Sequence, residues 1–312
     1  MLKAAFFTEA GTKRGMGHLI RCYCIYETFK QNNIKSSFFL DSDMNYNYKF
    51  NDIKYFKWNE LNFENNYDIV FIDSYEAPKK LYDSLSKKVK LLISIDDYGR
   101  LKYPKGIIIN FAPDSDKLFF QNKKNTSSYL LGLDYIPIRK EFLQTKVQKQ
   151  QQIFIMLGGN DIANLSEEIL SSLNNLNILK IVVTNSQQKI KKLSSFNNIK
   201  ILYKPNDNEL IKAMASSSLA ISTASMTLYE LSYLNIPSII VAINYNQKIG
   251  AFQSIKYNLA VKLLDIEQNN WKEELYNYIE QNKFRDKINT TPVIDGKGVK
   301  RIFDKIKEVF NL

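Results

Sequence analysis

The feature of this sequence that most constrains its fold is an alternation of short apolar runs with longer amphipathic stretches. The runs have the length of β-strands and the stretches that of α-helices, which is typical of repeated βα units around a parallel sheet. In the first half of the chain we predict strands over residues 3–7, 36–40, 69–73, 90–95 and 106–110, and helices that include 17–31 and 78–87.

A second set of alternations follows a polar break. Residues 144–152 have no apolar period and are predicted to form an interdomain linker. Beyond it we predict strands over residues 153–156, 178–183, 199–203, 219–222 and 238–242, and a helix over 166–176. The second half therefore repeats the architecture of the first, though not its sequence.

These patterns predict an α/β protein with two Rossmann-like, doubly wound domains, over residues 1–145 and 151–312. A chain of 312 residues also exceeds the usual size of a single hydrophobic core. Because such domains bind ligands at the carboxyl ends of their strands, we expect the two to face each other across a ligand cleft. The last helix, residues 299–310, is expected to pack back on the N-terminal domain.

The net charge of +11 raises the question of a nucleic-acid partner. Residues 1–150 carry 24 basic and 17 acidic side chains and the remainder 19 and 15, so the excess is +7 in one half and +4 in the other. No basic block or known nucleic-acid-binding motif focuses this charge, and we expect no nucleic-acid partner. A small anionic ligand such as a nucleotide fits the charge equally well.

The cysteines and the hydropathy indicate where the protein works. Cys22 and Cys24 lie two apart on a predicted helix, where a disulfide between them is not expected, and a reducing cytoplasm is the simpler interpretation. The apolar run at residues 1–7 is too short for a signal peptide. No apolar stretch reaches the roughly 18 residues of a membrane-spanning helix, although peripheral membrane contact stays open.

The first candidate site lies where the first strand leads into the first helix. Gly15 and Gly17 let backbone amides approach a ligand, and the helix N-terminus, with Arg21 one turn later, favours a diphosphate. His18 is the only histidine, and because an imidazole titrates near neutrality it is the first choice for a general base. The alternatives are a tight turn and a capping or core histidine. A metal held by His18 and Cys22 lacks the further ligands that zinc needs.

Carboxylates end the next predicted strands of the first half. Asp73 and Tyr75 follow an apolar strand and are candidates to orient or assist His18. A helix-capping aspartate and a surface tyrosine explain the pattern equally well. Asp96 and Asp97 end the following strand. They too are either site residues or capping and surface residues.

The second half carries a glycine-containing turn directly after its first strand. Its residues are Gly158, Gly159, Asn160 and Asp161. Backbone amides in such a turn can hold phosphate oxygens, so we predict substrate contacts here. A plain turn that connects strand and helix is the alternative.

Small polar residues also follow a later strand of the second half and open a helix. Ser225 and Thr227 are candidates to donate to a diphosphate, and Glu230 to accept the ribose hydroxyls of a nucleotide. Thr227 and Glu230 also fit a helix capping box. Further along, Asn246 and Gln247 either bind sugar hydroxyls through their amides or simply lie in a loop.

Taken together and in this order, the motifs resemble one family, the UDP-2,4-diacetamido-2,4,6-trideoxy-beta-L-altropyranose hydrolases of pseudaminic acid biosynthesis, which are related to the MurG-like glycosyltransferases. The matching segments are residues 15–21 (GMGHLIR), 72–75 (IDSY), 95–97 (IDD), 138–142 (IRKEF), 156–161 (MLGGND), Met226 to Glu230, and Asn246 with Gln247. Each segment alone is weak evidence for the family, but the ordered set extends from residue 15 to residue 247.

This resemblance implies a GT-B-like fold and a role for each matching residue. His18 would activate water for attack at the anomeric carbon, and UDP would leave with inversion, without a metal or cofactor. Tyr75 would lie near the sugar, and the C-terminal domain would bind UDP through Gly159, Asn160, Ser225 and Glu230. Two departures stand out: residues 222–225 read STAS where many relatives have SAGG, and the tail from Trp271 matches nothing that we can place.

Two other functions remain open at this point. A GT-B glycosyltransferase would use the same residues, with His18 deprotonating a sugar hydroxyl instead of water, and the fold does not decide between them. A non-catalytic protein that binds a sugar nucleotide is a third class, which the combination of His18, Asp73 and Tyr75 disfavours. In each case we expect a monomer whose ligand is a UDP-sugar.

Overall fold

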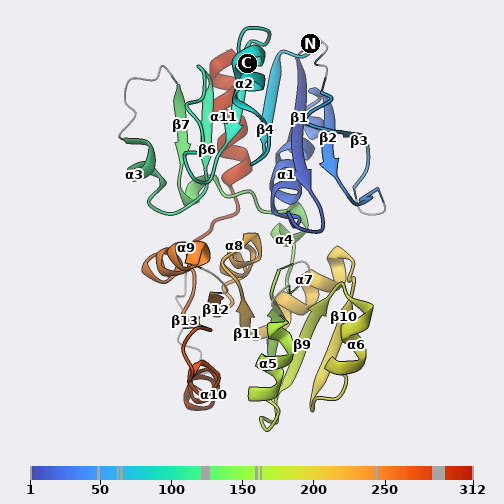
Figure 1. The fold of residues 1–312 in the computed structure, drawn as a ribbon, viewed down its shortest axis with the longest axis vertical. Coiled ribbons are helices and arrows are strands. Elements are labelled where there is room, and N and C mark those ends of the chain that lie inside the picture. The colour runs from blue at the N-terminus through green and yellow to red at the C-terminus, as the bar shows by residue number, and fades with distance from the viewer. Residues whose placement is uncertain are drawn as a thin grey trace. The chain divides into compact units, whose positions relative to one another are not determined.

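The chain forms two compact units, each built around its own parallel sheet (Figure 1). The computed structural model describes residues 2–47, 50–61, 63, 66–120, 127–158, 161, 164–242, 245–282 and 292–310. Unit 1 comprises Met1–Arg139 and Gly296–Leu312, and unit 2 comprises Lys140–Asp295.

Unit 1 contains a seven-stranded parallel sheet in the order β3-β2-β1-β4-β5-β6-β7. Its strands are β1 (Lys3–Ala10), β2 (Lys35–Ser42), β3 (Ile53–Phe56), β4 (Ile69–Asp73), β5 (Leu91–Ile95), β6 (Ile107–Asn110) and β7 (Ser128–Leu131). The strand order reverses between β1 and β4, which pair with Thr8 opposite Asp73. In open α/β sheets this reversal creates the crevice in which ligands bind.

The helices of unit 1 form in segments between its strands, where apolar residues recur at helical spacing. They are α1 (Gly17–Gln31), α2 (Lys79–Leu85), α3 (Ser115–Phe120), the 3-10 helix η1 (Leu133–Tyr135) and α11 (Gly298–Phe310). On α1, the buried residues Leu19, Cys22, Tyr26 and Phe29 recur at helical spacing and form the face turned to the sheet. The central strands β4 and β5 are buried along their whole length, as expected for a sheet covered on both faces.

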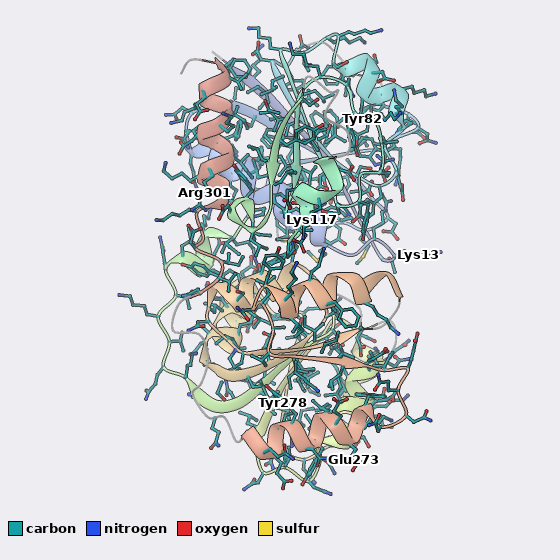
Figure 2. The ribbon with its side chains drawn as sticks, turned by 90° about the vertical axis from the view of Figure 1, so that its left-hand side faces the viewer. Lys13, Tyr82, Lys117, Glu273, Tyr278 and Arg301 are labelled. Atoms are coloured by element: carbon teal, nitrogen blue, oxygen red, sulfur yellow. The ribbon has the colours of Figure 1, made fainter. Side chains whose placement is uncertain are left out.

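The C-terminal helix α11 packs on unit 1. The rings of Phe303 and Phe29 on α1 meet edge to face with centroids 5.1 Å apart. Arg301, labelled in Figure 2, donates from Nη1 to the backbone oxygen of Asp134 in η1 at 2.9 Å. A Cβ atom at Gly298 would lie 2.1 Å from the oxygen of Ile136, so the first residue of α11 must be glycine. Residues 298–310, which the sequence pattern assigned to the C-terminal domain, are thus part of unit 1.

Unit 2 contains a six-stranded parallel sheet in the order β10-β9-β8-β11-β12-β13. Its strands are β8 (Gln150–Met156), β9 (Leu179–Thr184), β10 (Ile199–Tyr203), β11 (Ser217–Ser222), β12 (Ser238–Ala242) and β13 (Lys262–Asp265). Its helices are α4 (Lys140–Leu143), α5 (Leu165–Ser172), α6 (Gln187–Leu193), α7 (Asp207–Ser216), α8 (Met226–Tyr233), α9 (Tyr245–Lys256) and α10 (Trp271–Asn282). The order again reverses beside its first strand, between β8 and β11, so the predicted pair of doubly wound α/β units is confirmed.

Helix α10, which begins the tail that matched nothing in the family, completes the core of unit 2. Trp271, Leu275 and Ile279 of α10 are buried in the same apolar cluster as the strand residues Ile155 and Val241. Tyr278, labelled in Figure 2, is partly buried against that cluster. The spacing of these apolar residues at three to four positions is the period of an amphipathic helix.

The structure corrects several predicted boundaries. Strand β8 begins at Gln150, inside the predicted linker 144–152, because Gln150 pairs with Ser217 of β11 although it is exposed. Helix α5 ends at Ser172 rather than at residue 176. The strands β3, β7 and β13 were not predicted. No helix in the described part of the chain has both the length and the apolarity to span a membrane.

Candidate functional site

The turn before α1 places His18 at the carboxyl end of β1. The backbone of Gly11 and Gly15 pairs in both directions, with N–O distances of 3.1 and 2.8 Å. Gly15 has a φ of +71°, a left-handed conformation that glycine adopts without strain. The chain then enters α1 at Gly17, and His18 and Arg21 lie in its first turns, both buried.

His18 is hydrogen-bonded to a buried carboxylate at the end of β4. Its Nδ1 lies 2.6 Å from Oδ1 of Asp73, a residue with no solvent exposure. An ionised carboxylate only accepts, so Nδ1 carries the proton of this hydrogen bond and Nε2 is left as an acceptor. The arrangement matches the one by which an aspartate orients a histidine base.

Arg21 connects two carboxylates. Its Nε donates to Oδ2 of Asp73 and its Nη2 to Oδ1 of Asp73, both at 2.7 Å, while Nη1 and Nη2 donate to Asp97 at 2.8 and 2.9 Å. A side chain predicted to bind substrate is therefore engaged by two protein carboxylates through four of its five N–H groups. Nη2 also lies 3.0 Å from Nδ1 of His18, a close approach between two donors.

These charges fix the protonation of Asp73. Burial by itself would raise the pKa of its carboxyl, but the Arg21 guanidinium and His18 outweigh burial and lower that pKa to about 2. Desolvation opposes the charge on Arg21 as well, yet Asp73 and Asp97 raise the pKa of the guanidinium well above its ordinary value. The ion pair is consequently charged throughout the physiological pH range.

Tyr75 contacts both His18 and Asp97. Its ring meets the imidazole edge to face, with centroids 4.4 Å apart and planes at 90°. Its hydroxyl donates to Oδ2 of Asp97 at 2.6 Å. Burial and the nearby Asp97 carboxylate both raise the pKa of the phenol, which therefore keeps its proton. Tyr75 is nevertheless 40% exposed, so this group of side chains opens to solvent through the tyrosine.

A second buried carboxylate, which the sequence reasoning missed, holds the backbone of Tyr75. Glu9 at the end of β1 accepts from Nε1 of Trp58 at 2.9 Å, from the hydroxyl of Ser74, and from the backbone N–H of Tyr75 at 2.8 Å. Ser74 in turn accepts from the backbone N–H groups of Glu76 and Ala77. The available signal was weak: Glu9 is a charged residue near the end of a largely apolar run, without a recognisable motif.

The neighbouring residues Asp96 and Asp97 have different roles. Asp96 accepts from the backbone N–H groups of Tyr98 and Arg100 at 3.1 and 2.9 Å and so shapes the turn after β5. Burial raises the pKa of Asp96. Asp97 instead points to Arg21 and Tyr75 and belongs to the candidate site.

The residues predicted at the glycine turn of unit 2 lie directly after β8. Gly158 has a φ of +75°, and Asp161 is buried. The Asp161 carboxylate accepts from the backbone N–H groups of Leu165 and Ser166 at 3.0 and 3.2 Å and pairs with Lys189 at 3.0 Å. Asp161 therefore caps the start of α5. Gly159 and Asn160 lie outside the described residues.

The polar run after β11 leads into α8. Ser225 is the N-cap residue of α8 without capping it through its side chain, and its buried Oγ has no hydrogen-bond partner among the residues that the structure describes. Met226, Thr227 and Glu230 lie within the helix, the last two buried. Because the helix begins after Ser225, the alternative of a Thr227–Glu230 capping box is wrong.

Asn246 and Gln247 lie on the first turn of α9 rather than in a loop, and their side chains are outside the described part of the structure. A Cβ at Gly250 of α9 would lie 3.9 Å from Cβ of Ala224. Helix α9 therefore runs beside the polar run before α8.

The predicted residues thus gather at equivalent places in the two units. His18, Asp73 and Tyr75 lie at the strand-order reversal of the first sheet, while Gly158 and Ser225 lie at that of the second. Within the described residues, no three His, Cys, Asp or Glu side chains are grouped to hold a metal ion.

The chain resembles known proteins in sequence and in fold. No family model matches the chain. It is 30% identical, over 77% of its length, to a Helicobacter pylori protein named pseudaminic acid cytidylyltransferase and UDP-2,4-diacetamido-2,4,6-trideoxy-beta-L-altropyranose hydrolase. It is also 30% identical, over 44% of its length, to the Campylobacter jejuni UDP-2,4-diacetamido-2,4,6-trideoxy-beta-L-altropyranose hydrolase. The matched regions make up 45% and 58% of those relatives.

Solved structures resemble the fold over nearly the whole chain. MurG of Acinetobacter baumannii aligns with a TM-score of 0.65 at 14% identity, covering 98% of this chain and 99% of that one. The UDP complex of S. aureus MnaA aligns with a TM-score of 0.68 at 10% identity, covering 100% and 98%. The fold is therefore the GT-B-like one that the sequence predicted, and the resemblance to the hydrolase family is confirmed.

Proposed function

We propose that this chain, a homologue of the UDP-2,4-diacetamido-2,4,6-trideoxy-beta-L-altropyranose hydrolases, is a nucleotide-sugar hydrolase. Its substrate would be a UDP-linked 2,4-diacetamido-2,4,6-trideoxy sugar, and its products UDP and the free sugar. The reaction would need no metal and would invert the anomeric carbon, as a step of pseudaminic acid biosynthesis. The homology to the named hydrolases supports the substrate class.

The observation that carries the proposal is the hydrogen bond of 2.6 Å between His18 Nδ1 and Asp73. Because Nδ1 keeps its proton and donates it in the hydrogen bond to Asp73, Nε2 is the atom that can accept a proton from a nucleophile. The charged Arg21 keeps Asp73 ionised, and the buried pair holds the imidazole in one orientation. These are the features expected of a positioned general base.

The chemical step is a direct displacement. A water oxygen forms the new bond to the anomeric carbon while the bond from that carbon to the UDP oxygen breaks, and UDP leaves with the bonding electron pair. The water proton passes to Nε2 of His18, and the sugar keeps the resulting hydroxyl. Attack opposite the leaving group inverts the anomeric carbon.

Unit 2 is proposed to bind UDP. The hydroxyl of Ser225 is buried at the N-terminus of α8 with no partner in the described part of the chain, at a position where a helix favours negative charge. Gly158 precedes the predicted phosphate-binding residues Gly159 and Asn160. Buried Glu230 is the proposed acceptor for the ribose hydroxyls, and Asn246 and Gln247 are proposed sugar contacts.

The test is to incubate the purified chain with the UDP-linked sugar and a metal chelator and to follow the anomeric proton by NMR. Release of UDP, with the inverted anomer appearing first, is the expected result. Binding of the UDP-sugar without release, followed by turnover only when a sugar acceptor is added, would identify a glycosyltransferase instead. Binding without turnover under any condition would identify a sugar-nucleotide binding protein.

A further inference from the structure

We infer that the site selects water over alcohols by offering the nucleophile two hydrogen-bond acceptors, Nε2 of His18 and Oη of Tyr75. The inference rests on the proposed hydrolase function. It addresses whether water or a sugar hydroxyl is the nucleophile, which the fold does not decide. A water molecule has two O–H donors, whereas an alcohol, including a sugar hydroxyl, has one. Two acceptors that contact the same nucleophile therefore suit water better than an alcohol.

The first acceptor follows from the Asp73 hydrogen bond. A neutral imidazole has one donor and one acceptor nitrogen. Asp73 and Arg21 surround Nδ1, and the carboxylate of Asp73 at 2.6 Å requires the proton to be there. Nε2 is consequently the acceptor.

The second acceptor follows from Asp97. The hydroxyl proton of Tyr75 is committed to Oδ2 of Asp97 at 2.6 Å. Arg21 holds that carboxylate in place with two hydrogen bonds, to Oδ1 and Oδ2. A phenol whose only proton is given to a carboxylate has only lone pairs left for a further partner. Tyr75 is thus an acceptor toward any ligand in the site.

The two acceptors come from rings in direct contact. The imidazole of His18 and the phenol of Tyr75 meet edge to face at 4.4 Å between centroids. Glu9 fixes the tyrosine backbone through the N–H of Tyr75, and Asp73 fixes the histidine, so both rings are positioned by buried carboxylates. Because the two rings touch, we infer that one small nucleophile reaches both acceptor atoms.

An alcohol in the position of that water would satisfy one acceptor and leave the other unpaired. Sites built for a hydrogen-bonding group discriminate against analogues that lack it for this reason. Because Tyr75 is 40% exposed, solvent can partly satisfy its oxygen, so we expect discrimination of about three- to tenfold from this hydrogen bond.

The experiment measures which nucleophile captures the sugar. The purified chain is incubated with UDP-2,4-diacetamido-2,4,6-trideoxy-β-L-altropyranose in buffers that contain increasing methanol, the alcohol closest to water in size. Total UDP release reports the proposed function, and the ratio of methyl glycoside to free sugar, per mole of each nucleophile, reports the selectivity. The two readouts separate a failure of the function from a failure of the inference.

Three variants accompany the wild type. Tyr75→Phe removes the acceptor, and we expect its ratio to shift toward methanol by about three- to tenfold. Asp97→Asn lets the new amide donate to the phenol oxygen, which frees the phenol proton, and should shift the ratio in the same direction. Tyr98→Phe is the matched control, because its ring lies 5.4 Å from that of Tyr75 and is 66% exposed, and its ratio should equal that of the wild type.

Equal ratios for wild type and Tyr75→Phe, with UDP released by both, would overturn the inference while leaving the hydrolase function intact. If Tyr75→Phe turns over too slowly to measure, the ratio of Asp97→Asn decides in the same way. An absence of UDP release from the wild type would contradict the proposed function and the inference together.

Discussion

Nδ1 of His18 lies 2.6 Å from Oδ1 of Asp73, although 55 positions separate the two residues in the sequence. The contact exists because β1 and β4 are neighbours in the sheet and both end at the same edge. Arg21, one turn along the same helix as His18, completes the group by pairing with the same carboxylate. The proposed chemistry requires that Asp73 and Arg21 remain charged and that His18 keeps its orientation.

Asp73→Asn tests how much the ionised carboxylate of Asp73 contributes to stability. The folded-state pKa of Asp73 is about 2, below the roughly 4 of an unfolded aspartate, so its ionisation stabilises the fold fully above pH 4 and progressively less as the pH falls toward 2. We expect Asp73→Asn to lower the free energy of unfolding at pH 6, and the difference from wild type to be about 1 kcal/mol smaller at pH 3.

Urea denaturation at the two pH values measures this difference. Asp83→Asn is the matched control, because Asp83 makes an exposed ion pair with Lys79 on α2 and such pairs contribute about 0–1 kcal/mol. A difference between wild type and Asp73→Asn that is the same at both pH values would contradict the lowered pKa.

Glu9→Gln tests the support beneath Tyr75. The Glu9 carboxylate accepts from Trp58, Ser74 and the backbone of Tyr75, and a glutamine amide would oppose one of those donors with a donor of its own. We expect a loss of about 1–3 kcal/mol of stability together with a lower kcat. Glu76 is an exposed carboxylate next to Tyr75 in the sequence, so Glu76→Gln should change neither stability nor kcat.

Ser225→Ala tests the proposed UDP site. Because the buried Oγ of Ser225 bonds to none of the described residues, its removal should leave thermal stability unchanged. If the hydroxyl binds the diphosphate, affinity for UDP should fall by about 10-fold, as expected for a hydrogen bond to a charged group. Calorimetric titration with UDP gives the answer, and unchanged affinity would remove Ser225 from the site.

Phe303→Ala tests the assignment of α11 to unit 1. Its buried ring packs on Phe29, and truncating a buried phenylalanine costs about 3–5 kcal/mol. Val309→Ala, on the same helix but 47% exposed, should cost much less. Equal melting temperatures for the two variants would show that α11 contributes no core to the fold.

The sequence predicted the parts of this fold that follow from local pattern. Buried strands such as β4 and β5 are largely apolar runs, and Asp73, Tyr75 and Asp97 lie at or just after their ends. Short or edge strands such as β3, with an exposed middle, give no such run. Helix α7 was missed although its Asn206–Glu209 capping box is a local signal.

The contacts inside the site were harder to predict, because they join residues that are distant in the chain. Arg21 was expected to meet substrate, whereas the structure pairs it with two carboxylates more than fifty positions away. Glu9 and Trp58 gave no motif at all, since their pairing depends on how β1 and the segment after β3 are placed. The catalytic and UDP-binding roles of the site residues stay predictions.

The most direct test of the account compares wild type with His18→Ala on the UDP-linked sugar. A positioned general base contributes about 100- to 10,000-fold, so kcat/KM should fall by that factor while calorimetric affinity for UDP stays within about twofold. That result would support His18 as the base. Turnover of His18→Ala close to the wild-type rate, with the same products, would contradict the central claim.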